Sequence, residues 1–239
     1  MKEFLNSDEP NFIFKGVNAL VDMGCIIEKE IPDIQARPNI DEISVVGRSG
    51  TLTEWHGDYE PYDLDVGKIS ILYANLEEVR RWLTGSGELI THNDYGKFIE
   101  AIPDFSLARK YENEWGYFYT FDLTFRCQPL KRKVNEQPLL LNRASQTFFN
   151  PGSIKSFPKI EFYNAQNVYF KLVCNHVELT LPHLGKGAVT IDCEKGMAIQ
   201  GGEIVRSVGE WPEIYPGENE VSIYGDYLDA KLFMRSLWL

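Results

Sequence analysis

The sequence has no closely spaced pair of cysteines, and its basic residues are fewer than its acidic ones. The cysteines at positions 25, 127, 174 and 193 form no CxxC motif. A disulfide framework is therefore excluded, and we expect buried, reduced thiols. The 24 lysines and arginines stand against 35 aspartates and glutamates, for a formal net charge of −11. Because phosphate binding requires basic side chains that release counterions, this balance argues against a protein that wraps nucleic acid.

Long apolar runs are missing as well. No stretch of about 18 apolar residues occurs, so no membrane-spanning helix is expected. The first ten residues, MKEFLNSDEP, have no apolar core of the kind that defines a signal peptide. Together with the unpaired cysteines, this predicts a protein that is made and folded in a reducing cytoplasm.

Aromatic residues, in contrast, are plentiful. The 239 residues include 14 Phe, 12 Tyr and 5 Trp, and this composition favours strands over helices. The length suits one large domain or two of modest size. We therefore expect a mainly β protein that folds without disulfides or metal ions.

The first half predicts an α+β domain with one helix at about residues 75–84, within NLEEVRRWLTG. Asn75 and Glu78 have the spacing of a capping box, and Gly85 stands where a carboxy-terminal cap is expected. The apolar positions of this segment fall on one helix face, which must pack on a sheet because two turns of helix are unstable alone. Four strands are predicted around it: EISVVG (42–47), KISILYA (68–74), GKFIEAIP (96–103) and GYFYTFDLTFRC (116–127).

A change of pattern near residues 128–153 suggests a domain boundary at about residue 132, which gives domains 1–132 and 133–239. Prolines and the basic triplet Lys131-Arg132-Lys133 interrupt the alternation there, and we interpret the triplet as a solvated linker. Beyond it, short strand-like runs are separated by turn residues about every 8 to 12 positions, as in an all-β sandwich. These runs are PKIEFYN, NVYFKLVC, HVELTLP, AVTIDC, MAIQ, ENEVSIYG and KLFMRSLWL.

Two groups of residues have a composition that could bind metal ions. A zinc site would use Cys174, His176, His183 and Cys193, but their spacing fits no zinc motif, and buried thiols with surface histidines are expected instead. A calcium site would use the carboxylates of DYEPYDLDVG, which are Asp58, Glu60, Asp63 and Asp65. The glycine and glutamate positions of an EF-hand loop are not met, so a solvated, charged hairpin is expected.

No stretch of the sequence predicts catalysis. The run Gly47–Gly50 fits neither a nucleophile elbow nor a phosphate-binding loop, and Gly85–Gly87 follows the predicted helix rather than preceding one. No catalytic, cofactor-binding or metal-binding residue is assigned, and no enzyme is expected. The aromatic residues Trp55, Tyr59, Tyr62, Trp82, Trp115 and Trp211 leave two alternatives open, a sugar-stacking surface or a role in the core and at subunit interfaces.

Four segments in order carry a resemblance to a known family. They are FKGVNALVDMGCIIEKEIP, VVGRSGTLTEWHGDYEPYDLDV, the helix ending in WLTGSGELI, and WPEIYPGENEVSIYG. In their order and spacing they resemble the distal tail proteins of bacteriophages with long, flexible, non-contractile tails. The resemblance extends along nearly the whole chain.

The resemblance implies a structural protein of the virion. Distal tail proteins have an amino-terminal α+β domain that forms a ring of six copies, and a carboxy-terminal β-sandwich resembling galectins. Two rings can pair in isolation. The ring is the hub of the tail tip, which is assembled in the host cytoplasm, and it joins the tail tube protein to a tail-associated fibre or lysin protein. DNA passes through its lumen without specific binding, and neither cofactor nor membrane is involved.

Two further expectations follow from the resemblance. Some relatives insert a carbohydrate-binding module into the sandwich, whereas residues 133–239 contain no long loop that could hold one, so galectin-like shape is expected without sugar binding. A carbohydrate-binding module protein that recognises cell-wall glycans remains the alternative function. Six copies of a chain with charge −11 carry −66, and a lumen of that sign would let DNA slide without sticking.

Overall fold

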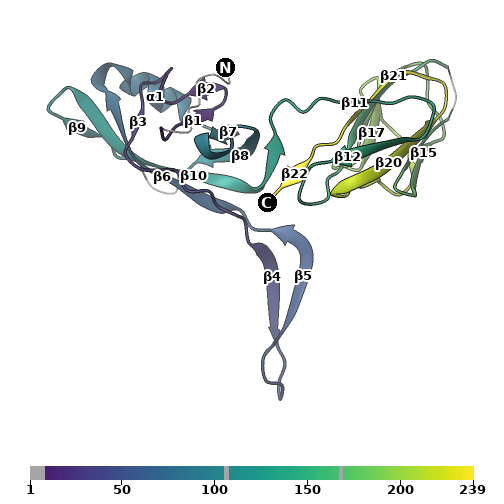
Figure 1. Ribbon diagram of the computed structural model, residues 1–239, viewed down its shortest axis with the longest axis horizontal. Helices are drawn as coiled ribbons and strands as arrows, with labels where there is room; N and C mark the ends of the chain where they lie inside the picture. The colour runs from purple at the N-terminus through teal and green to yellow at the C-terminus, as the bar shows by residue number, and fades with distance from the viewer. Residues whose placement is uncertain (1–8, 105–107, 167–168) are drawn as a thin grey trace. The chain divides into compact units, whose positions relative to one another are not determined.

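The computed structural model describes residues 9–104, 108–166 and 169–239. Residues 1–8, which include most of the segment compared with a signal peptide, lie outside this range. The chain divides into two compact units, one running up to Val134 with the addition of Leu239, and the other spanning Asn135–Trp238 (Figure 1). Each has its own hydrophobic core. In the described part of the chain, no helix is both long and apolar enough to cross a membrane.

The first unit is built on a large antiparallel sheet. Its strands follow the order β2-β1-β7-β8-β10-β6-β3, and β9 pairs with β10 as well. The helix α1 (Leu76–Trp82) follows a 3-10 turn at Tyr73–Asn75, and a second such turn lies at His92–Asp94. The strands are β1 (Phe12–Phe14), β2 (Val17–Asn18), β3 (Ile26–Ile27), β6 (Tyr62–Leu72), β7 (Gly87–Thr91), β8 (Lys97–Pro103), β9 (Glu112–Glu114) and β10 (Phe118–Lys133).

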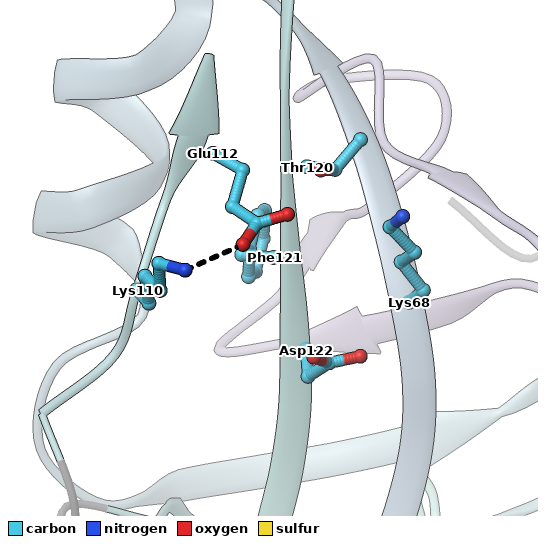
Figure 2. Close-up of a pocket in the computed structure, with 6 residues that line it drawn as sticks. All are labelled: Lys68, Lys110, Glu112, Thr120, Phe121 and Asp122. Carbon is cyan, nitrogen blue, oxygen red and sulfur yellow. Dashed lines mark hydrogen bonds and ion pairs between the residues drawn. The ribbon is translucent and has the colours of Figure 1, made fainter. Parts of the chain in front are cut away.

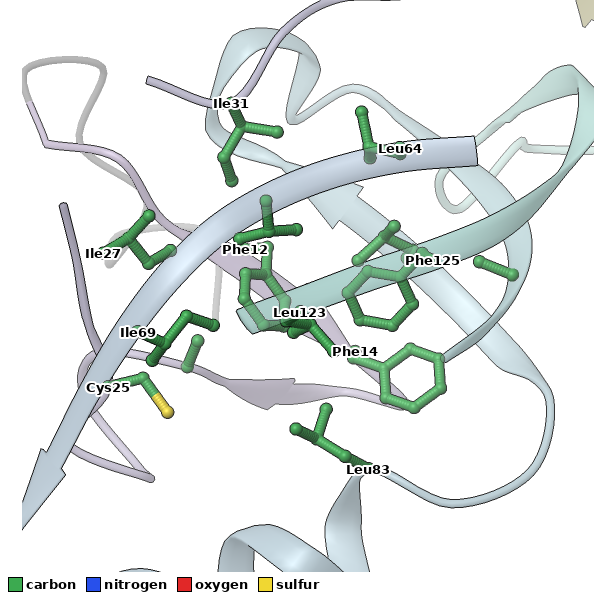
Figure 3. Close-up of a cluster of buried hydrophobic side chains, with 14 of the residues drawn as sticks. Phe12, Phe14, Cys25, Ile27, Ile31, Leu64, Ile69, Leu83, Leu123 and Phe125 are labelled. Carbon is green, nitrogen blue, oxygen red and sulfur yellow. The ribbon is translucent and has the colours of Figure 1, made fainter. Parts of the chain in front are cut away.

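Strand β10 shows how alternation builds this core. Phe121, Leu123, Phe125 and Cys127 are buried, as the sequence predicted for one face of the strand. Figure 3 shows two of these side chains, Leu123 and Phe125, among others of the cluster. The ring of Phe125 meets that of Phe12 edge-on, with ring centroids 5.5 Å apart. The predicted α+β character of the first half is thus confirmed.

The helix packs as expected but begins differently. Val79 and Leu83 are fully buried, so the apolar face of α1 lies on the core. The capping box was wrong, because Asn75 makes no side-chain cap bond and has helical backbone angles. Its Nδ2 instead donates a hydrogen bond to the Met23 carbonyl at 3.0 Å. A long-range contact has replaced the local one.

The charged segment DYEPYDLDVG is not a separate hairpin. Its second half opens β6, where Leu64 and Val66 are buried between exposed aspartates. Its first half closes β5 (Thr51–Tyr59), which pairs with β4 (Pro38–Ser44) in a two-stranded sheet of its own. The apolar residues Leu64 and Val66 stand two positions apart, which is the spacing of one strand face. The charged residues around them concealed this strand signal.

The basic triplet is not a linker. Strand β10 continues to Lys133, and Lys131 to Lys133 pair with residues of β8. Lys131 is buried, and its Nζ lies 2.5 Å from Asp33 Oδ1. The carboxylate compensates the charge, so a lysine can occupy a strand position that sequence alone assigns to solvent.

The second unit is a β-sandwich of two antiparallel sheets, as predicted. One sheet has the order β11-β21-β13-β16-β17-β18, and the other has the order β12-β20-β14-β15-β19. Its strands are β11 (Leu139–Leu140), β12 (Gln146–Asn150), β13 (Lys159–Asn164), β14 (Phe170–Cys174), β15 (Val177–Leu181), β16 (Gly187–Asp192), β17 (Met197–Gln200), β18 (Glu203–Val205), β19 (Val208–Gly209), β20 (Gly217–Tyr224) and β21 (Tyr227–Phe233). The last strand, β22 (Leu237–Trp238), belongs to neither sheet of the sandwich.

Inward side chains of the two sheets form the second core. Phe162 of β13 stacks on Phe170 of β14 with ring centroids 4.0 Å apart. The segment before β20 contributes Ile214, which is fully buried and forms a bridge with Ser156. Gly217 has φ 89°, as the Pro-Gly turn requires. The stretch WPEIYPGENEVSIYG is therefore a turn and strand of the sandwich.

Two predicted runs of the second half differ in detail. The run NVYFKLVC includes residues 167 and 168, which lie outside the described residues, and β14 covers its end. The run KLFMRSLWL is divided between β21 and β22 because Arg235 has φ 51°. The backbone N–H groups of Arg235 and Ser236 donate to the Glu136 carboxylate there, at 2.7 and 3.2 Å.

Candidate assembly surfaces

The four carboxylates of the calcium hypothesis each have a partner of their own. In each case the partner is a cation or an amide within hydrogen-bond distance, and the hydrogen bond from Lys29 holds the pKa of Asp65 below its usual value. The pairs are Asn39 Nδ2 with Asp58 at 2.7 Å, Arg37 Nε with Glu60 at 2.6 Å, Arg126 Nη1 with Asp63 at 3.1 Å, and Lys29 Nζ with Asp65 at 2.7 Å. Each carboxylate is thus held by its own partner, and the four described carboxylates do not converge on one point where a metal ion could bind.

The residues of the zinc hypothesis are also separated. Cys174 and Cys193 are buried, and burial raises the pKa of each thiol to about 12. His176 and His183 are exposed. Among the residues that the structure describes, no group of three or more His, Cys, Asp or Glu side chains is arranged to hold a metal ion. All four cysteines of the chain are free and buried, as predicted.

The six aromatic candidates do not form one surface. Trp82 is a core residue that stacks on Phe12 with ring centroids 5.6 Å apart, and Trp211 packs against the core of the second unit. Trp55 is half exposed in the β4–β5 sheet, and its Nε1 donates to the Asp58 carbonyl at 2.8 Å. Trp115, in contrast, is 90% exposed.

One hollow of the first unit contains charged side chains that are paired with each other. This hollow, of about 170 Å³, lies over β6 and β10, and Figure 2 shows its lining, which includes Lys68, Thr120 and Asp122. The Glu112 carboxylate there is bound by Lys110 Nζ at 2.7 Å. This hydrogen bond lowers the pKa of Glu112 and raises that of Lys110, so neither group is poised to exchange a proton near neutral pH.

A larger exposed feature is the hairpin formed by β4, β5 and the turn between them, residues 38–59, which we call the arm (Figure 1). Every residue of β4 is exposed, and so is every residue of β5 except the half-buried Tyr59. Its large apolar side chains are Ile40, Ile43, Val45, Val46, Leu52 and Trp55, all at least 44% exposed, with Val46 fully exposed. Such a concentration of exposed apolar side chains is typical of an interaction surface.

The backbone of the arm is unpartnered as well. Among the residues that the structure describes, its two strands pair only with each other, so both outer edges present N–H and C=O groups outside any described sheet. An isolated two-stranded hairpin is marginally stable in water, and long exposed edges invite pairing with another chain. At the root, Glu60 N–H donates to the Arg37 carbonyl at 2.9 Å, and the two side chains form an ion pair. The arm is thus held at its base by a backbone hydrogen bond and an ion pair, whereas its strands are exposed to solvent.

The charges of the arm are mostly uncompensated. Asp41 stands directly opposite Glu54, and Glu42 follows on the same strand. Like charges opposite each other destabilise an antiparallel pair. The Nε2 atom of His56 lies 4.0 Å from Glu54 Oε1, and no described lysine or arginine lies within ion-pair distance of Asp41 or Glu42. Cations from a second molecule would remove this repulsion.

A second exposed group of apolar side chains lies where β6 ends and β9 turns into β10. We call it the aromatic end. Leu72 and Phe118 are direct cross-strand partners, and Tyr73 N–H donates to the Tyr117 carbonyl at 3.0 Å. With Trp115, these five residues are between 40% and 90% exposed. Sequence analysis singled out only Trp115, because β9 is three residues long and too polar to signal a hairpin.

Trp115 also occupies a strained position. It has φ 58° and is followed by Gly116 with φ 74°, in the three-residue connection between β9 and β10, and positive φ values of this kind are normally adopted by Gly or Asn. A tryptophan there costs backbone strain and leaves a large apolar ring in water. A residue that folding disfavours twice points to a function in binding.

Comparisons with known proteins bear on the fold. No family model matches the chain, and no curated protein sequence does so either. A solved structure does match, that of SPP1 Dit (gp 19.1), described as a paradigm of the hub adsorption apparatus in phages that infect Gram-positive bacteria. The match has a TM-score of 0.71 and covers 96% of this chain and 99% of that chain, at 11% sequence identity. The chain has the fold of SPP1 Dit.

The Dit fold confirms the fold expected from the resemblance to distal tail proteins. It covers both units, from the sheet that carries the arm to the sandwich. At 11% identity the likeness establishes the architecture.

Proposed function

We propose that this chain is a structural protein of a phage tail tip, where six copies assemble into a ring. The ring is a hub that joins the tail tube protein on one side to the tail-associated fibre or lysin protein on the other. The observation that carries the proposal is the Dit fold over nearly the whole chain together with an arm whose strands pair with no other strand of the described chain.

The arm supplies the physical reason for assembly. Its apolar side chains and both strand edges face water in the single chain. Each fully buried large apolar side chain stabilises an assembly by about 1.5–3 kcal/mol. Covering several of them at once offsets the loss of freedom that association costs. An arm that reaches a neighbouring copy turns an unstable element of the monomer into the contact that holds the ring.

The charge fits a hub through which DNA passes. Each chain has a net charge of −11, and six copies carry −66. A lumen that shares this sign repels phosphate groups and adds no counterion release that would hold DNA in place. The proposed location is the tail tip of the virion, after assembly in the host cytoplasm. In this role the protein acts by shape and contact, without catalysis.

The first experiment measures the mass of the purified chain by light scattering coupled to size exclusion, followed by negative-stain imaging of the main peak. The expected result is a mass near six times 27.5 kDa, or twice that for paired rings, with ring-shaped particles. A matched variant replaces residues 40–57 by a short glycine linker and should give a folded monomer. A full-length chain that stays monomeric at high concentration and binds cell-wall glycans would instead support the carbohydrate-binding alternative.

A further inference from the structure

The pairing of the two strands of the arm is interrupted near the base of the arm. Pro38 pairs with Tyr59 and Ile40 pairs with Trp55, so β4 has one residue between these pairs, whereas β5 has three, residues 56–58. Extra residues of this kind form a β-bulge, which bends the bulged strand and disrupts the ladder of hydrogen bonds. The bulge therefore separates the outer arm, residues 40–55, from the Pro38–Tyr59 pair at the base.

The backbone of the bulge depends on Gly57. This residue has φ 87°, a conformation that glycine adopts without the steric cost that a Cβ atom would bring. A Cβ atom built on Gly57 would meet no described atom within 4 Å, so no packed neighbour holds the residue in place. With the ladder disrupted and no packing around Gly57, the backbone alone does not fix the direction of the outer arm.

Side-chain contacts cross the bulge in place of ladder hydrogen bonds. Trp55 Nε1 donates to the Asp58 carbonyl at 2.8 Å, and the ring of Trp55 meets that of Tyr59 edge-on, with ring centroids 5.7 Å apart. From the other strand, Asn39 Nδ2 donates to the Asp58 carboxylate at 2.7 Å. Trp55 thus belongs to the outer arm but contacts both the bulge and the base.

Trp55 contributes to neither hydrophobic core. Its side chain is half exposed, and it is absent from the clusters of buried residues in both units and from the side chains packed against them. The fold of the first unit therefore does not explain a tryptophan at this position. Its contacts with Asp58 and Tyr59 both act on the angle between the outer arm and the base.

We propose that Trp55 and Asp58 hold the bulge in one conformation and so set the direction of the outer arm before assembly. The consequence for assembly rests on the function proposed above, in which the arm contacts a neighbouring copy. An arm that is already ordered loses less conformational freedom when it makes this contact, and binding is correspondingly tighter. Trp55 is in this sense a positioning residue of the arm.

Single-molecule energy transfer tests the proposal on the full chain. Fluorescent dyes are attached to Val46→Cys, which is fully exposed at the tip of the arm, and to Glu100→Cys, an exposed position on β8. The four native cysteines are buried, and burial raises the pKa of each thiol to about 12, so they do not react with the dyes. Measurement at picomolar concentration selects single chains, and the donor lifetime gives the distribution of distances between the dyes.

The otherwise unchanged chain should give one narrow distribution of distances. Trp55→Ala and Asp58→Ala should each broaden it, because each removes a contact that crosses the bulge. Trp55→Phe keeps an aromatic ring beside Tyr59 but cannot donate to the Asp58 carbonyl, so its distribution should have an intermediate width. Thermal unfolding of these variants should match that of the wild type, since the core of the first unit does not include Trp55 or Asp58.

Two matched controls change the outer arm without changing a contact across the bulge. Leu52→Ala removes an exposed apolar side chain, and Asp41→Ala removes an exposed carboxylate. Both should leave the distribution as narrow as in the unchanged chain. A broad distribution in the unchanged chain would overturn the proposal, and so would a distribution that stays narrow in both Trp55→Ala and Asp58→Ala.

Assembly is measured separately, with Asp58→Ala. This variant removes no apolar side chain from the arm, so its effect on assembly reports the direction of the arm. The concentration for half-assembly should rise about tenfold, as expected when one more segment must be ordered on contact, whereas Asp41→Ala should not raise it.

The two measurements distinguish this inference from the ring itself. A chain that assembles into rings but has the same distances with and without Trp55 overturns the inference and leaves the proposed function standing. A chain whose distances broaden in Trp55→Ala but that never assembles confirms that these residues hold the bulge, and it overturns the ring.

Discussion

At the residue scale, the ion pair between Asp192 and Arg235 stabilises the second unit. Asp192 has a 9% exposed side chain and accepts hydrogen bonds from Arg235 Nη1 at 2.7 Å and Nη2 at 3.1 Å. Burial opposes its ionisation, but the hydrogen bonds and the charge of Arg235 outweigh burial, so its pKa lies below the usual value. Arg235 lies in the break between β21 and β22, so the pair also holds this connection against the end of β16.

Asp192→Asn should lower the free energy of unfolding by about 1–3 kcal/mol at pH 7, because it leaves Arg235 half-buried with a weaker partner. A carboxyl group with a depressed folded pKa stabilises the fold above its unfolded pKa of about 3.9, and this contribution is lost as pH falls through the folded pKa. The difference between wild type and variant should therefore shrink below about pH 4.

Urea unfolding at pH 7 and pH 3 measures this difference. The control is Asp226→Asn, which breaks the more exposed pair with Arg143 and should change the free energy of unfolding by less than about 1 kcal/mol. A difference for Asp192→Asn that stays the same at both pH values would contradict the assignment.

At the element scale, the start of α1 depends on a contact with a distant loop. A capping box would make Asn75→Asp neutral or stabilising, because Asp is an equally good cap and its charge suits the helix amino terminus. The structure predicts the opposite. Asp cannot donate to the Met23 carbonyl as Asn75 Nδ2 does, so the variant should be less stable by about 1–2 kcal/mol.

The comparison with Glu78→Gln makes this test specific. Glu78 is exposed, and the helix has no side-chain cap bond, so this variant should change the free energy of unfolding by no more than about 0.5 kcal/mol. Thermal unfolding of both variants at neutral pH is sufficient. A stabilised Asn75→Asp together with a destabilised Glu78→Gln would restore the capping box.

The elements also show what could be predicted from the sequence. The alternation of β10 and the turn before β20 follow from local rules, so they were anticipated. The buried Lys131 was not, because its partner Asp33 is 98 residues away. Trp115 was noted as an aromatic residue, but its exposed position depends on a three-residue strand that leaves almost no pattern. Local patterns therefore revealed the scaffold, while the arm and the aromatic end required the structure.

At the scale of the whole molecule, the two hydrophobic cores share no residue. The second unit should then fold by itself, because its sheets and its core are completed within Asn135–Trp238. A fragment of these residues should unfold cooperatively in urea. Asp192→Asn should lower its stability by the same amount as in the full chain. A fragment without cooperative unfolding would show that the sandwich depends on the first unit.

The net charge gives a prediction for the assembled ring. A protein that neutralises six phosphates gains roughly 10³-fold or more in DNA affinity when salt falls from 200 to 50 mM. A ring that carries −66 and repels DNA along its lumen should show no such gain. Gel retardation of a short duplex by the ring, at 50 and 200 mM salt, should give no shifted band at either concentration. A band that appears at 50 mM and disappears at 200 mM would mean that basic residues line an accessible surface, and that the acidic excess lies elsewhere on the ring.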